Sequence, residues 1–141
     1  MTAELDSGAL DSRLRRGREA YGRQFGVAAT EAEASLQQLI GVRMAREAVL
    51  AAGGVWGSGP LSTRDRSLAV VSALTTLGGV DPRLRSHLRF AMHNGVSRSE
   101  LEELFVLLAL YVGYARASVA MEALRAVVGP APDEASVARG R

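Results

Sequence analysis

Apolar residues recur at intervals of three or four positions along most of this sequence, and this spacing predicts amphipathic α-helices rather than strands. In residues 97–112, for example, Leu101, Leu104, Phe105 and Leu108 fall on one side of a helix. We therefore predict an all-α fold of five or six helices joined by short loops. The predicted helices cover residues 12–25, 30–52, 62–77, 81–93, 97–112 and 115–128.

Polar residues at the predicted helix starts support several of these boundaries. Thr30 with Glu33, and Ser97 with Glu100, have the spacing of a capping box, in which a hydroxyl and a carboxylate bind free backbone amides. Asp81 is followed by a proline at the first helical position. The helix over residues 62–77 is apolar on most of its surface, so we expect it to be the central buried helix.

The length of 141 residues and the 48% hydrophobic content are typical of one globular domain. Residues 1–11 are weakly patterned, and we expect a flexible N-terminus there. Residues 12–129 form the predicted helical domain. Residues 130–141 follow the last apolar stripe, and we expect a disordered tail.

The composition excludes several kinds of chemistry. The chain has no cysteine, which removes disulfides, zinc–thiolate sites, iron–sulfur clusters and thiol catalysis. With two histidines in the sequence, a histidine-rich metal site is not expected, and we predict no cofactor and no metal.

The charge pattern and the longest apolar stretches bear on partners and location. The net charge is +2, and every basic residue other than the two histidines is an arginine. Arginines cluster between residues 13 and 23, but glutamates are interspersed or close by, so we predict no nucleic-acid partner. No stretch reaches the roughly 18 apolar residues of a membrane span, and no signal peptide is visible, so we expect a cytoplasmic protein.

A series of motifs between Val55 and Leu124 carries a resemblance to a known family. The motifs are Val55-Trp56, Pro60-Leu61, Arg64-Asp65-Arg66-Ser67-Leu68, Leu77-Gly78, His87-Leu88, Ala91, Asn94-Gly95-Val96, Glu100, Glu103, Tyr111 and Gly113. Their order and spacing resemble the carboxymuconolactone decarboxylase family, a relative of proteins with the alkylhydroperoxidase D-like fold. The stretch from Leu14 to Gly22 also resembles the family's N-terminal helix.

This resemblance implies an all-α subunit that assembles into a homo-oligomer, commonly a trimer or hexamer. It also implies cofactor-independent loss of carbon dioxide from an unsaturated lactone acid, so the expected partner is a small-molecule carboxylic acid. The thiol-dependent relatives use a Cys-x-x-Cys pair, which this chain lacks.

Four positions depart from the family pattern. Phe25 stands where the N-terminal motif has a histidine, and Ala52 where a tryptophan is usual. Leu107 replaces a polar residue four positions before Tyr111, and Ala115 replaces a proline. We expect these positions to line the pocket, so the resemblance supports the fold but leaves the specific lactone substrate open.

Three residues are candidates for catalysis. His87 matches the family's histidine and has an ordinary pKa near physiological pH, which suits proton transfer; the alternative is a buried structural histidine. Arg66 lies in the first turn of a predicted helix and would anchor a carboxylate or stabilise an enolate; the alternative is an ion pair with Glu103 or another carboxylate. Glu103 matches an acidic family position and would orient His87 or Arg66.

Four further residues are candidates for substrate binding. Trp56 and Tyr111 would form pocket walls, although aromatic residues at helical spacing more often pack in the core. His93, near a helix end, either compensates for Phe25 or is a surface residue. Arg116 interrupts a run of small residues and either replaces lost polar groups in the pocket or contacts another subunit.

Three functions remain open at this point. The first is a decarboxylase acting in aromatic degradation. The second is a tailoring enzyme of a biosynthetic pathway on the same fold, which decarboxylates, cyclises or isomerises an intermediate. The third is a non-catalytic ligand-binding oligomer.

Overall fold

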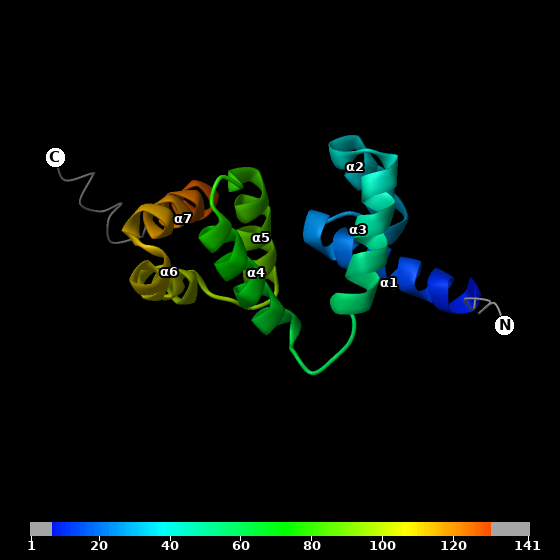
Figure 1. Ribbon diagram of the computed structural model, residues 1–141, viewed down its shortest axis with the longest axis horizontal. Coiled ribbons are helices and arrows are strands. Elements are labelled where there is room, and N and C mark those ends of the chain that lie inside the picture. The colour runs from blue at the N-terminus through cyan, green and yellow to red at the C-terminus, as the bar shows by residue number, and fades with distance from the viewer. Residues whose placement is uncertain (1–6, 131–141) are drawn as a thin grey trace. The chain divides into compact units, whose positions relative to one another are not determined.

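The computed structural model describes residues 7–130, and all regular structure within them is α-helical (Figure 1). These residues form seven helices, more than the five or six predicted. The helices are α1 (Ser7–Phe25), α2 (Ala29–Ile40), α3 (Val42–Val55), α4 (Thr63–Leu77), α5 (Asp81–His93), α6 (Arg98–Val112) and α7 (Tyr114–Val128).

The extra helix arises because the single helix predicted over residues 30–52 is divided at Gly41. This glycine has a φ of 81°, in the left-handed region, and it ends α2 and precedes α3. The apolar stripe continues across the break, so the periodicity alone did not reveal it.

The predicted helix ends were right at some positions and wrong at others. Ser97 and Glu100 form both hydrogen bonds of a capping box at the start of α6, as predicted. The capping box predicted at Thr30 and Glu33 is wrong, because α2 begins at Ala29 and its N-cap, Ala28, has no side-chain cap. Of the N-terminus predicted to be flexible, residues 7–11 belong to α1; residues 1–6 and 131–141 lie outside the described part.

The chain divides into two compact units, residues 1–63 and residues 64–141. In the first unit, α1 packs on α3 and α2 around a small core of Leu14, Leu36, Ala45 and Val49. Glycines allow the backbones of α1 and α3 to come close, since a Cβ on Gly53 would overlap the backbone carbonyl of Arg13. Arg16 Nε donates a hydrogen bond of 3.1 Å to the carbonyl of Gly53, near the end of α3.

The second unit contains α4 to α7, and its core is the larger of the two. The buried members are Val71, Leu84, Leu88, Ala91, Val96, Leu101, Phe105, Ala120, Ala123 and Leu124. The prediction that α4 is the central buried helix is wrong: its buried residues are Ser67, Val71 and Thr75, whereas Leu77 is exposed. Its apolar side chains are spread around the helix, so most of them cannot face one core.

Hydrogen bonds satisfy the two buried hydroxyls on α4. Thr75 Oγ1 donates to the carbonyl of Val71 at 2.8 Å, and Ser67 Oγ accepts from Asn94 Nδ2 at 2.9 Å. The second bond ties the start of α4 to the end of α5. None of the helices within residues 7–130 has the length and apolar character needed to cross a membrane.

Candidate functional site

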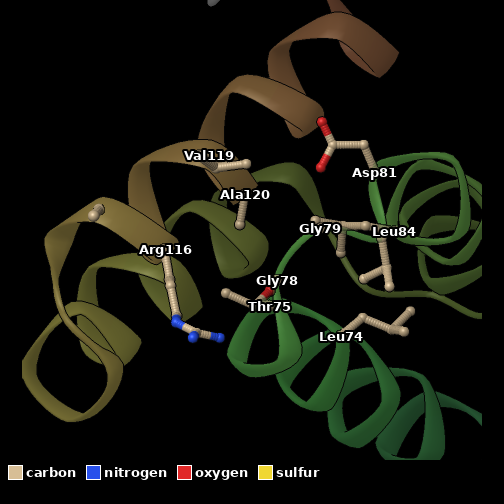
Figure 2. A pocket seen from close by; sticks show the side chains of 11 residues that line it. Leu74, Thr75, Gly78, Gly79, Asp81, Leu84, Arg116, Val119 and Ala120 are labelled. Carbon is tan, nitrogen blue, oxygen red and sulfur yellow. The ribbon is translucent and has the colours of Figure 1, made fainter.

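A cavity of about 200 Å³ lies in the second unit, where the end of α4, the start of α5 and the first turns of α7 meet (Figure 2). Gly78 and Gly79 form the connection between α4 and α5, with φ values of 70° and 67° that favour glycine. The cavity wall is mostly apolar and includes Leu74, Leu84 and Ala120. It carries two charged side chains, Arg116 and Asp81.

Arg116 reaches from α7 to the carboxyl end of α4. Its Nη1 donates to the carbonyl of Leu77 at 2.8 Å and also to the carbonyl of Thr76. These carbonyls belong to the last turn of a helix, which has no intrahelical donors for them and favours a positive charge. Nε and Nη2 of Arg116 form no hydrogen bond with another described residue. The sequence made Arg116 a candidate for substrate binding or for a subunit contact, and neither role is tested by a single chain; the structure places Arg116 on the cavity wall and gives it a capping role at the end of α4.

Asp81 stands on another part of the cavity wall, at the first position of α5. In Figure 2 its carboxylate lies apart from the Arg116 guanidinium, with Gly79 and Ala120 between them. Within residues 7–130 the carboxylate makes no hydrogen bond or ion pair. In the sequence, Asp81 has only the signal of a residue at a helix start, and nothing connects it with Arg116, which lies 35 positions further along the chain.

His87 is on α5, one helical turn after the cavity residue Leu84. The side chain is half-buried, and burial, followed by the nearby Arg83 charge, lowers the pKa of His87 below 6.5. Both causes disfavour the imidazolium. His87 is therefore neutral near pH 7, and it enters any reaction as a neutral donor or as a base.

The ring of Phe90 contacts the rings of both histidines of α5. The rings of Phe90 and His87 meet edge to face with a centroid separation of 6.5 Å, and the Phe90 ring stacks on His93, also at 6.5 Å, with an interplanar angle of 13°. His93 itself is exposed at the end of α5, which agrees with the surface alternative for this residue.

Glu103 and Tyr111 are both exposed on α6. Tyr111 is 75% exposed, so the alternative of core packing is wrong for it. Its neighbours Leu107 and Leu110 are also exposed, by 54% and 78%. Among the described residues, Glu103 forms no ion pair, so the alternative in which it neutralises Arg66 is wrong as well.

Arg66 and Trp56 lie in different units. Arg66 is half-buried in the first turn of α4, and its neighbour Arg64 forms the ion pair with Glu100. Trp56 ends α3 in the first unit, where its amide donates to the carbonyl of Ala52 at 2.9 Å. The convergence of His87, Arg66 and Glu103 around one substrate stays a prediction.

Comparison with known proteins adds a family match that spans both units. Residues 43–126 match the model described as the carboxymuconolactone decarboxylase family, and this range contains all seven candidate residues. The chain is also similar to a 4-carboxymuconolactone decarboxylase from Acinetobacter baylyi (strain ATCC 33305 / BD413 / ADP1), with 38% identity over 85 residues. The match covers 58% of this chain and 63% of that relative, less than two thirds of the relative's length.

Proposed function

The chain belongs to the carboxymuconolactone decarboxylase family, and from that premise we propose that it is a cofactor-independent decarboxylase. Its substrate would be a small carboxylic acid related to carboxymuconolactone. The family match carries this proposal, because it includes every candidate residue in a single range. The apolar cavity with an arginine on its wall supports it, since such a site suits a small organic acid.

The proposed reaction breaks the bond between the substrate's carboxylate carbon and the adjacent carbon. Carbon dioxide leaves, and the electron pair passes into the carbonyl group conjugated with that carbon, giving an enolate. A proton then adds to carbon to complete the reaction. The protein has to stabilise the enolate oxygen and provide a route for this proton.

In this proposal His87 serves both needs. In the neutral form favoured by its lowered pKa, the imidazole donates its one N–H hydrogen bond to the enolate oxygen, then transfers this proton to carbon while its other nitrogen takes up a proton from solvent. Arg66 adds positive charge near the enolate, and Glu103 orients one of these two groups. Tyr111 and His93 contribute walls and donors, and Arg116 holds a carboxylate that is not lost.

We further propose that the protein is a homo-oligomer and that a second copy covers the exposed face of α6. A contiguous apolar surface on a helix commonly marks an interface. The face carries Leu107, Leu110 and Tyr111. Covering it would also enclose Glu103, whose carboxylate is otherwise open to water.

The proposed activity is tested by incubating the purified full chain with 4-carboxymuconolactone and measuring carbon dioxide and the remaining lactone. We expect carbon dioxide to appear in step with lactone loss, without added metal or redox cofactor. Consumption of the lactone without carbon dioxide would favour a cyclising or isomerising tailoring enzyme. Binding without consumption would contradict catalysis on this substrate and favour the ligand-binding alternative.

The proposed assembly is tested by light scattering coupled to size-exclusion chromatography. We expect an oligomer for the natural chain and a smaller species for Leu110→Asp. Leu39→Asp is the matched control, because Leu39 is a leucine of similar exposure, 68%, on α2. A monomeric natural chain, or equal effects of the two substitutions, would contradict the proposed interface.

A further inference from the structure

We propose that the cavity between α4, α5 and α7 is a binding site for a single-ring acid that carries one carboxylate, and that it discriminates against diacids. This inference rests on the proposed function for the ligand class, a small carboxylic acid, and it adds the size and charge of the ligand. The residues that set the selectivity are Arg116 and Asp81.

The cavity volume limits the ligand to about one ring. An apolar protein cavity of roughly 150 Å³ can hold one benzene molecule. The cavity beside Arg116 has about 200 Å³, and its walls include Leu74, Leu84 and Ala120. It therefore has room for a six-membered ring with small substituents, and its walls suit the faces of such a ring.

Arg116 supplies the group that recognises the carboxylate. Its Nη1 is bound to the carbonyls of Thr76 and Leu77, which fixes the position of the guanidinium. Nε and Nη2 have no hydrogen-bond partner in the described part of the chain and remain available as donors. A guanidinium held in place by other bonds binds a carboxylate with less loss of side-chain entropy.

Asp81 determines what the other end of the ligand can be. Its carboxylate accepts no hydrogen bond and forms no ion pair within residues 7–130, so it can accept a bond from a ligand hydroxyl. A second ligand carboxylate on that side would meet a like charge, which is unfavourable at the edge of an apolar cavity. The proposed substrate is itself such a diacid, with one carboxylate that Arg116 holds and one that is lost. The site would therefore hold this substrate less tightly than the monoacid product, and departure of carbon dioxide would relieve the repulsion from Asp81.

The test compares two ring acids of similar shape by isothermal titration calorimetry on the full chain. The probes are 4-hydroxybenzoate, with one carboxylate and a hydroxyl, and terephthalate, with a carboxylate at each end. We expect 4-hydroxybenzoate to bind at least about tenfold more tightly, because one like-charge contact is worth about a factor of ten or more in affinity. Failure of both probes to bind, or tighter binding of terephthalate, would overturn the proposal.

Two variants assign the selectivity to the named residues. Asp81→Asn should reduce the preference for 4-hydroxybenzoate to about twofold or less, and Arg116→Gln should weaken binding of both probes about tenfold or more. Arg125→Gln is the matched control. It also removes one positive charge from α7, but Arg125 lies in the last turn of that helix and does not line the cavity. A preference that survives Asp81→Asn, or Arg125→Gln weakening binding as much as Arg116→Gln, would overturn the assignment.

Circular dichroism melting of each variant separates loss of binding from loss of folding. Arg116 also caps α4, and if Arg116→Gln unfolds, the Asp81→Asn result alone decides the proposal. These titrations need no turnover. Selective binding without carbon dioxide release would support the proposed binding site and reject the proposed function. Carbon dioxide release without selective binding would support the proposed function and reject the binding site.

Discussion

Substitution of two adjacent glycines in α3 tests the close packing of α1 on α3. Gly53 and Gly54 are neighbours in the same helix, so replacing either one by alanine gains the same intrinsic helix propensity, roughly 0.5–1 kcal/mol. Their surroundings differ. A Cβ on Gly53 would overlap the carbonyl oxygen of Arg13 and lie 2.8 Å from its carbonyl carbon, whereas ordinary contact begins at 3.4 Å.

A Cβ on Gly54 would instead meet the end of a flexible side chain. The nearest atom is Arg13 Nη2 at 2.6 Å, and this side chain can move aside by giving up an exposed hydrogen bond from Nε to the carbonyl of Leu50, a loss that the propensity gain roughly offsets. For Gly53→Ala, by contrast, the backbones of two helices must separate, and overpacking of this kind costs typically 1–3 kcal/mol. The propensity gain offsets part of this, so we expect Gly53→Ala to lower the free energy of unfolding by about 1–2 kcal/mol. Gly54→Ala should be neutral or stabilising by up to about 1 kcal/mol.

Urea denaturation followed by far-ultraviolet circular dichroism measures both variants. With slopes of about 1–3 kcal/mol per molar urea, the two midpoints should differ by several tenths molar or more, with Gly53→Ala the lower. Equal midpoints, or a lower midpoint for Gly54→Ala, would show that the two helices are not in backbone contact at Gly53.

Two further predictions concern stability. Ser97→Ala removes the hydroxyl that accepts from the Glu100 amide at the start of α6, and we expect a loss of about 1 kcal/mol; an unchanged thermal midpoint would show that the capping box is not formed in solution. The lowered pKa of His87 predicts a pH effect. The unfolded chain, with an ordinary histidine pKa near 6.5, binds a proton that the folded chain resists. The stability that the neutral His87 contributes to the free energy of unfolding is therefore fully present above pH 6.5. It declines as the pH falls through 6.5 toward the lower pKa of His87 in the folded chain. His87→Asn should flatten this decline in denaturation measured across the pH range, and an equally steep decline in that variant would contradict the assignment.

Local signals predicted the helices well, because apolar periodicity and capping residues are properties of short stretches. Ser97 and Glu100 show this, since the capping box needs only four residues and no tertiary contact. Gly41 shows the limit of periodicity: one left-handed residue divides a helix without interrupting the apolar stripe. The error at α4 has a related cause, since an apolar composition does not say which side of a helix faces the core.

The candidate site was harder to predict because it depends on residues distant in sequence. Arg116 became a candidate through its unusual place among small residues, but its bonds to the carbonyls of Thr76 and Leu77 depend on the tertiary structure that brings its side chain to the end of α4. Asp81 lines the cavity because the fold brings residues of α4, α5 and α7 together there, and the sequence does not show this arrangement. Tyr111 was expected to be covered, and it is exposed in a single copy of the chain.

The most direct test of the account compares carbon dioxide release by the natural chain and by His87→Ala. At equal protein concentration, with folding of both confirmed by circular dichroism, we expect kcat/KM for 4-carboxymuconolactone to fall at least about a hundredfold in the variant, as for loss of a proton-transfer group. Release by His87→Ala at the natural rate would remove His87 from the reaction and contradict the mechanism proposed for it.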